Sequence, residues 1–211
     1  MQIVMIQNNS RPLCFAIGVV LAVFVLPFST RAQERVGNAT AGISIVPPSG
    51  WHVTSMQEVM KNRSRVRLPD AQLEAGLQRA TAPLFVFSKY QEPHATLNPT
   101  VQVVLRPRPA SLPTSATALL RIATVTLQKA FPDFAFVEPI QDVQVSGMSA
   151  AYMKATYTLR SANGEHPILS RTWVVPRGSF MFLIGMSGAP DGADMCEAEF
   201  AAALMSIAID K

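Results

Sequence analysis

Apolar residues recur in short runs, many of them alternating with polar residues, over most of the chain after residue 41. Runs of this kind that are bounded by proline, glycine or asparagine predict β-strands. The expected strands cover residues 42–46, 51–53, 84–87, 101–105, 137–145, 150–159, 167–175 and 179–186. The last four predict a β-meander, because Ser146-Gly147 and Asn163-Gly164 are typical of tight turns between antiparallel strands.

Three segments carry apolar residues at helical spacing instead. The expected helices cover residues 70–80, 114–131 and 191–207. In the second of them Leu119, Ile122 and Leu127 approximate one face, and Pro132 ends the helix. Residues 54–68 fit two patterns, a helical turn and an extended segment with a cation at every second position.

The first residues have the pattern of a secretory leader. Arg11 precedes an apolar run over residues 13–26, which ends at Pro27 and is followed by the small residue Ala32, a possible cleavage point. The run is shorter than the roughly 20 residues that a membrane-spanning helix needs. We therefore expect residues 1–32 to be a cleaved signal peptide and the protein to be exported, to the periplasm or the medium. Anchoring by an uncleaved leader is the weaker alternative.

The remaining chain has the length of one domain. We expect a flexible N-terminus over residues 33–41 and a single domain over residues 42–211. Removal of the leader takes away Arg11 and Arg31 and lowers the formal net charge from +4 to +2. A nucleic-acid-binding role is disfavoured, because such proteins usually carry a concentrated basic face.

No recognisable catalytic or cofactor motif is present. The three histidines, His52, His94 and His166, lack metal-binding spacing, and loss of Cys14 leaves Cys196 as the only cysteine. The chain has no G-x-S-x-G nucleophile motif and no glycine-rich phosphate loop. We predict no catalytic residue, no metal and no cofactor. Histidines or carboxylates that converge only in the fold would leave a hydrolase possible.

Two clusters of side chains are candidate binding surfaces. The first is basic and would bind acidic lipid head groups or an acidic protein if residues 61–67 are extended. It consists of Lys61, Arg63, Arg65, Arg67, Arg106 and Arg108. The second is an aromatic and histidine set that could form a ligand platform, and it consists of Trp51, His52, Tyr90 and His94. The alternatives are a solvated basic loop and a Trp51 side chain packed in the core.

Two short patterns resemble the PsbP-like superfamily, which includes photosystem II extrinsic subunits, a yeast nuclear-import factor that binds Ran, and bacterial DcrB-like envelope proteins. The patterns are Ile43-Ser44-Ile45-x-Pro47-x-x-Gly50-Trp51 and Val143-x-Val145-x-Gly147-x-x-Ala150-Ala151-Tyr152. The strand at 101–105 and the helix at 114–131 also match, so the resemblance covers about residues 42–208. Residues 54–82 depart from its short connection.

The resemblance implies an α+β fold, a central antiparallel sheet with helices packed on both faces (an α/β/α sandwich). It also implies a binding or assembly role without a shared catalytic site. Our first hypothesis is therefore an exported, non-enzymatic accessory protein that binds an envelope protein in bacteria. One alternative is a periplasmic carrier of a small apolar ligand or lipid, held between sheet and helix. The other is an unrecognised hydrolase.

Overall fold

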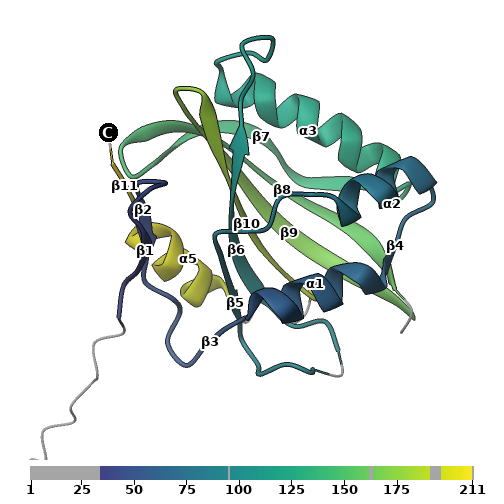
Figure 1. Cartoon of the computed structure of the whole chain (residues 1–211). Coiled ribbons are helices and arrows are strands. Elements are labelled where there is room, and N and C mark those ends of the chain that lie inside the picture. The colour runs from purple at the N-terminus through teal and green to yellow at the C-terminus, as the bar shows by residue number, and fades with distance from the viewer. Residues whose placement is uncertain (1–33, 95, 162–163, 191–195, 211) are drawn as a thin grey trace, which may run out of the picture. The chain divides into compact units, whose positions relative to one another are not determined.

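Long antiparallel strands dominate the computed structural model, which describes residues 34–94, 96–161, 164–190 and 196–210 (Figure 1). The main sheet has eight strands in the order β3-β5-β6-β10-β9-β8-β4, and β7 also pairs with β8. Their bounds are β3 (His52–Val53), β4 (Val66–Arg67), β5 (Phe85–Ser88), β6 (Thr100–Pro107), β7 (Ala135–Val145), β8 (Met148–Ser161), β9 (Gly164–Arg177) and β10 (Phe180–Gly188). The predicted large antiparallel sheet is confirmed.

The meander from β7 to β10 follows the sequence pattern closely. Ser146 and Gly147 join β7 to β8 with positive φ angles of 52° and 72°, and Gly178 joins β9 to β10 with a φ of 57°. Such angles suit glycine, which has no Cβ to clash with the backbone. The Asn163-Gly164 turn lies partly outside the described residues, because residue 163 is not among them.

A second, three-stranded sheet joins the two ends of the described chain. It has the order β1-β2-β11, with β1 (Val36–Asn38), β2 (Ile43–Ile45) and β11 (Ala208–Ile209). Residues 36–38 thus differ from the flexible N-terminus that we expected over residues 33–41. The reason is tertiary, because Val36 packs against the core and Arg35 Nη1 donates to the carbonyl of Ser206 at 2.8 Å. The predicted leader lies outside the described residues.

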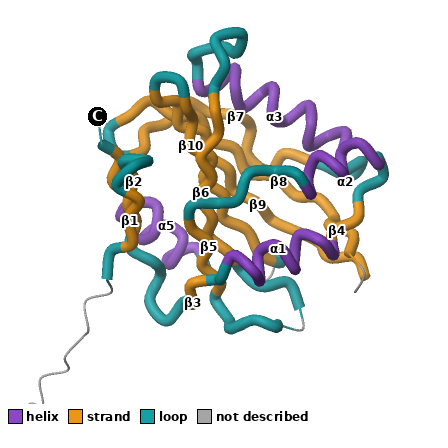
Figure 2. The backbone as a smooth tube through the Cα atoms, viewed as in Figure 1, coloured by secondary structure: helices purple, strands orange, loops and turns teal. Residues whose placement is uncertain are grey.

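The described residues form four helices (Figure 2). They are α1 (Met56–Arg65), α2 (Ala71–Gln78), α3 (Ala116–Ala130) and α5 (Glu197–Ser206). Helix α1 begins with a capping box, in which Ser55 and Glu58 each accept from the other's backbone N–H. The Asp70 carboxylate caps α2 and the Ser115 hydroxyl caps α3. Residues 56–65 are therefore helical, so the extended alternative is wrong for residues 61–65, whereas residues 66–67 are extended in β4.

Alternate residues of the main sheet enter two different apolar clusters. Trp173 and Val175 of β9 belong to the larger cluster, which contains α5 and the small sheet. Val174, between them, belongs to a smaller cluster with Leu119 and Leu120 of α3. The chain therefore buries apolar residues on both sides of β9.

The described part of the chain contains no helix long and apolar enough to cross a bilayer.

Candidate functional site

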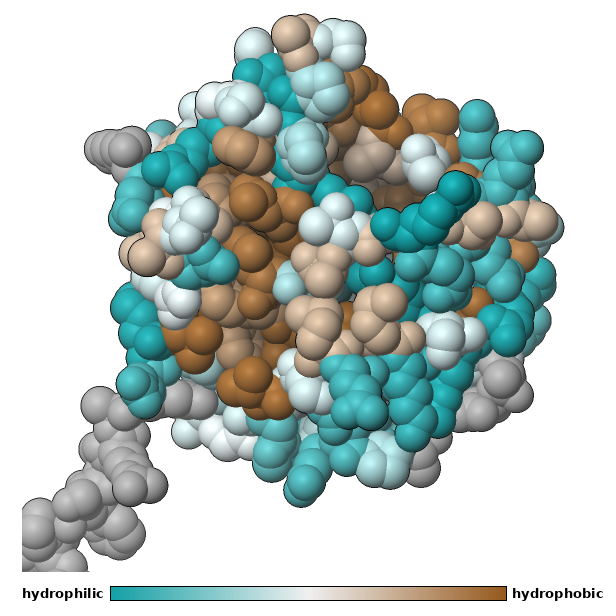
Figure 3. Space-filling view, in the orientation of Figure 1, coloured by the Kyte–Doolittle hydropathy of each residue, from teal (hydrophilic) through white to brown (hydrophobic). Residues whose placement is uncertain are grey.

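A cavity of about 940 Å³ lies between the main sheet and helices α1, α2 and α3. Its floor is formed by β5, β6, β10, β9 and β8, through the side chains that alternate with those of the larger core cluster. Figure 3 shows a hollow with apolar side chains around it between α3 and the α2–β5 connection. The volume lies within the range of about 300 to 1,000 Å³ that is usual for small-molecule sites.

Part of the cavity floor is polar. The strand register aligns a row of hydroxyl side chains across four strands, namely Ser88, Thr100, Ser187 and Ser170. Thr54 Oγ1 lies 2.6 Å from Ser88 Oγ. Thr100 Oγ1 lies 3.2 Å from Ser187 Oγ. These hydroxyls can both donate and accept hydrogen bonds, so the floor suits a ligand with polar groups as well as water.

A second polar row lies beside the first. Gln102 of β6 and Thr172 of β9 both pair with Gly185 of β10. A Cβ at Gly185 would lie 3.1 Å from Gln102 Nε2, so the glycine leaves room for the amide side chain over the strand. The Gln102 side chain is exposed although it lies in a central strand, because it faces the cavity.

The walls of the cavity are apolar. On the α3 side they include Leu127, Phe131 and Tyr157, whose two aromatic rings stack at 4.3 Å between centroids. Burial raises the pKa of Tyr157 above its ordinary value, so its phenol is neutral at physiological pH. On the opposite side Leu73 and Leu77 of α2 face the same space. The cavity is therefore amphipathic, with a polar floor and apolar walls.

Helices α1 and α2 cover the cavity without burying any residue of their own. Their inward apolar side chains, such as Val59, Leu73 and Leu77, are only half-buried because they line the hollow. The two helices are tied by hydrogen bonds from the Arg63 guanidinium to the Ala80 carbonyl and from the Gln78 amide to the Arg63 carbonyl. This pair forms most of the segment that departs from the short connection expected over residues 54–82.

Three arginines of the predicted basic cluster, Arg63, Arg65 and Arg106, line the cavity. Arg63 Nη1 donates to the Ala80 carbonyl at 2.6 Å and Arg63 Nη2 donates to the Thr81 carbonyl at 3.4 Å. Arg106 Nη1 donates to Thr81 Oγ1 at 3.3 Å. Two arginines from distant segments thus meet at Thr81.

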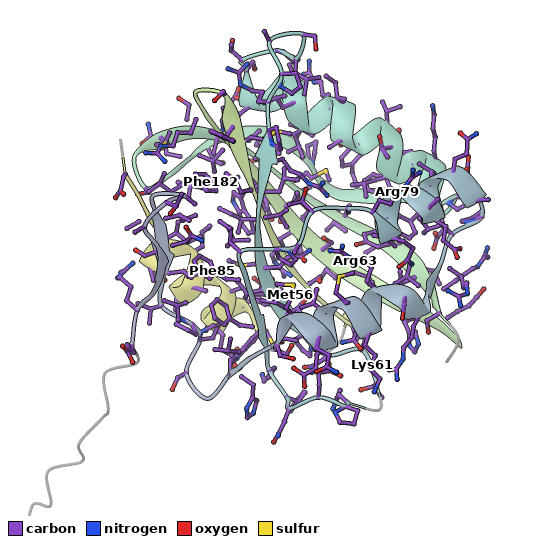
Figure 4. The ribbon with its side chains drawn as sticks, in the orientation of Figure 1. Met56, Lys61, Arg63, Arg79, Phe85 and Phe182 are labelled. Atoms are coloured by element: carbon purple, nitrogen blue, oxygen red, sulfur yellow. The ribbon has the colours of Figure 1, made fainter. Side chains whose placement is uncertain are left out.

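The other three members of the basic cluster lie elsewhere. Lys61 is exposed and points away from the cavity on the far side of α1, whereas Arg63 points toward it (Figure 4). Arg67 forms an ion pair with Glu74 at 3.7 Å. Arg108 donates to the carbonyl of Gly178 beside the β9–β10 turn. A period of two brings cations together on a strand, but it separates them on a helix, which turns 100° per residue.

The aromatic and histidine set is also divided. Trp51 is buried in the larger core cluster, edge-on to Phe200 at 5.8 Å, which is the packing alternative given for it above. His52 is exposed on the short strand β3. Tyr90 and His94 stack at 4.6 Å, and His94 lines the cavity.

The described residues show no metal site, and the contacts of His94 do not form a catalytic triad. No group of three or more histidine, cysteine, aspartate or glutamate side chains among them could hold a metal ion. His94 Nε2 lies 3.0 Å from Thr96 Oγ1, but Glu92 accepts from the backbone N–H of His94 and not from its ring. His94 is therefore not hydrogen-bonded to a carboxylate in the way that a catalytic triad requires.

A smaller hollow of about 630 Å³ lies on the other side of β6 and β10. Leu84, Leu105 and Phe182 line it beside residues that lead into the small sheet. In Figure 3 an apolar strip follows this part of the surface. Of the described residues in its lining only Arg177 is charged, and that guanidinium donates to the Ala41 carbonyl.

Sequence reasoning did not identify the cavity. A usable signal was present in the central strands, where Ser170, Thr172, Gly185 and Ser187 occupy the face opposite the core residues. Small and polar residues on a sheet face that helices also cover indicate space between the layers. The residues of α1 and α2 could not be assigned to that face from sequence, because their position depends on where residues 79–84 lead the chain.

No family model matches the chain, and no curated protein matches it by sequence. Solved structures are similar to it. The solution structure of cyanobacterial PsbP (CyanoP) from Synechocystis sp. PCC 6803 is 13% identical, with a TM-score of 0.51 over 94% of this chain and 98% of that one. A Pseudomonas aeruginosa protein of unknown function, described as a putative regulator, is 11% identical, with a TM-score of 0.51 over 77% and 99%.

LpqN, which is involved in cell envelope biogenesis of Mycobacterium tuberculosis, is 14% identical over 84% of this chain and 90% of its own, with a TM-score of 0.49. At these identities a similarity concerns the fold alone. The two comparisons with a TM-score above 0.5 cover most of the chain and nearly all of each neighbour. The chain therefore has the PsbP-like fold that its short sequence patterns predicted.

Proposed function

We propose that this protein is an exported, non-enzymatic binding protein of the bacterial envelope that carries a small amphipathic ligand in the cavity beneath α1, α2 and α3. The observation that supports it is the cavity itself, about 940 Å³ with a polar floor and apolar walls. This corresponds to the carrier alternative of the sequence analysis. The docking role that we put first has no comparable observation among the described residues.

The energetics of the covering helices favour an occupied cavity. Helices of ten and eight residues are too short to be stable alone in water, so they depend on packing of their apolar side. Here that side faces a hollow, and Val59, Leu73 and Leu77 remain half-buried. A bound ligand would remove this apolar surface from water, at about 25 cal/mol for each Å² buried. Ligand binding and ordering of α1 and α2 would then be coupled.

We further propose the α/β/α arrangement of layers, with α3 on the cavity side of the sheet and α5 on the other. It is supported by the alternation of Trp173 and Val174 between the two apolar clusters. Export is supported by the leader pattern over residues 1–32. In this arrangement the large cavity lies on the α3 side of the sheet, and the larger core cluster lies on the α5 side.

Native mass spectrometry of protein freshly purified from an envelope fraction tests the proposal. The wild-type protein should retain a small molecule that leaves on denaturation. Thr172→Phe places a large side chain on the cavity floor in a strand that tolerates aromatic residues, and it should lose that mass. Thr156→Phe, on neighbouring β8 with the opposite orientation, should keep it. Wild-type protein that never carries a ligand, together with unchanged stability after addition of amphiphiles, would contradict the proposal.

A further inference from the structure

We propose that the ligand carries an anionic head group, a carboxylate or a phosphate, that Arg63 and Arg106 bind at the edge of the cavity. The inference rests on the proposed function, because it assigns the chemistry of the molecule that the cavity holds. The tail of the ligand would lie along the apolar wall of α3 and β8.

Charge is the first argument. The cationic residues lining the cavity include Arg63, Arg65 and Arg106, whereas Glu92 is the only acidic residue among the described ones that line it. The Glu92 carboxylate is already engaged, since it accepts from the side-chain amide of Asn98 at 3.1 Å and from the backbone N–H of His94 at 3.2 Å. Within the described residues, neither Arg63 nor Arg106 has a carboxylate within ion-pair distance. The arginine side of the cavity therefore carries uncompensated positive charge.

Geometry is the second argument. The two guanidinium groups come from α1 and β6, which are distant in sequence, and both bond to Thr81. Their partners there are a carbonyl and a hydroxyl, which position a guanidinium but do not neutralise it. Each guanidinium has five N–H donors, and within the described part of the chain Arg106 uses one of them, toward Thr81. Two forks that converge in this way suit the oxygen atoms of a carboxylate or phosphate.

Burial is the third argument. Arg63 and Arg106 are half-buried and both bond to the α2–β5 connection, so water screens them less than it screens the exposed Lys61. A partly desolvated cation that has only neutral partners gains more from an incoming anion than an exposed one does. The apolar wall of Leu127, Phe131 and Tyr157 belongs to the same cavity. A molecule with an acidic end and an apolar end would satisfy both regions.

Binding measurements with amphiphiles of one chain length test whether the protein prefers an anionic head group. The probes are dodecanoate, dodecyl phosphate, dodecanol and inorganic phosphate, each titrated into protein stripped of ligand and checked for folding by circular dichroism. We expect the two anionic amphiphiles to bind about tenfold or more tightly than dodecanol, as two charge-assisted contacts imply. Inorganic phosphate should bind weakly, because it lacks the tail. Preference between dodecanoate and dodecyl phosphate would identify the head group.

Variants locate the interaction. Arg106→Gln and Arg63→Gln should each weaken binding of the anionic amphiphiles about tenfold and leave dodecanol unchanged. Lys61→Gln removes an equal charge two residues from Arg63 on the outer side of α1, and it should have little effect. If Arg63→Gln disturbs α1, Arg106→Gln and the charge-conserving Arg63→Lys still test the proposal.

The outcomes separate this inference from the proposed function. If dodecanol binds as tightly as the anionic probes, or if Lys61→Gln weakens binding as much as Arg106→Gln does, the anionic head group is wrong and the carrier function stands. If no amphiphile binds to the wild-type protein, both proposals fail.

Discussion

At the scale of single residues, Arg171 shows how this fold accommodates a charge. It is the one charged residue among the buried residues that the structure describes, at 3% exposure. Its Nη2 donates to the Glu197 carboxylate at the start of α5, and its guanidinium lies 5.3 Å from the Phe200 ring centroid. Its Nη1 is buried and has no hydrogen-bond partner among the described residues. Nothing in the sequence singled out Arg171, because its burial depends on where α5 packs.

Removal of Glu197 should therefore destabilise the protein. We expect Glu197→Ala to lower the free energy of unfolding by about 1–3 kcal/mol, since it leaves the Arg171 charge buried without its anion while the half-exposed Glu197 site admits some water. Urea denaturation measures the change. Glu165→Ala is the control, because the Arg160–Glu165 pair is exposed and should contribute less than about 1 kcal/mol. Equal losses in the two variants would contradict the prediction.

Tyr152 should make stability fall at high pH. Burial, and secondly the Glu138 carboxylate, raise the pKa of Tyr152 from 10.0 to about 12. The phenol is neutral in both states below pH 10, so its contribution is fully present there. Between about pH 10 and 12 the unfolded chain loses the proton first, and the contribution is lost. Denaturation at a series of pH values checks this, and Tyr152→Phe should show a shallower decline. An unchanged decline in Tyr152→Phe would assign the effect to another group.

At the scale of elements, the short helices α1 and α2 are the part of the fold that was hardest to predict from the sequence. Helix α3 was predicted nearly to its ends, and Pro132 marked where it stops, although the Ser115 cap at its start was not identified. Its face was less well predicted, since Leu120 and Thr124 are buried whereas Ile122 is exposed. For residues 54–68 the two patterns had equal support, and the Ser55–Glu58 capping box, which we did not identify, favours the helix.

The Ser55 cap should stabilise α1 more than the rest of the domain. Ser55→Ala removes the acceptor for the Glu58 backbone N–H and should speed hydrogen exchange of the α1 amides about fivefold, since such a cap contributes about 1 kcal/mol. Exchange in β8 and β9 should not change, because these strands are held by the core. Ser115→Ala is the matched control in α3, which Leu119 and Leu120 anchor, and it should leave α1 exchange unaffected. Uniform acceleration across the domain would contradict a local effect.

At the scale of the whole molecule, the two faces of the main sheet contribute differently. One face packs densely through Phe87, Phe182 and Ile184 against α5 and the small sheet. The other packs through Met153 and Val174 under α3 and then opens into the cavity. The larger core cluster thus lies on one side of the sheet and the large cavity on the other.

Adjacent residues of β5 test this division. Phe87 is 1% exposed in the larger cluster, whereas Val86 lines the cavity. Phe87→Ala should lower the free energy of unfolding by about 3–5 kcal/mol through lost burial and a new void. Val86→Ala should cost about 1 kcal/mol or less, because its side chain already borders open space. Thermal or urea denaturation of ligand-free protein distinguishes them, and similar losses would show that both faces are equally packed.

The sequence by itself determined the strands of the meander and the helix over residues 114–131, because these follow from local periodicity and turn residues. It also indicated the PsbP-like fold, through the resemblance that two short patterns carry. It also named Arg63, Arg106 and His94 as candidates. Only the tertiary structure decided which candidates share a site, because convergence of α1, β6 and the α2–β5 connection depends on contacts between segments distant in sequence. The cavity belongs to that second class, since its lining is assembled from helices and strands that are distant in sequence.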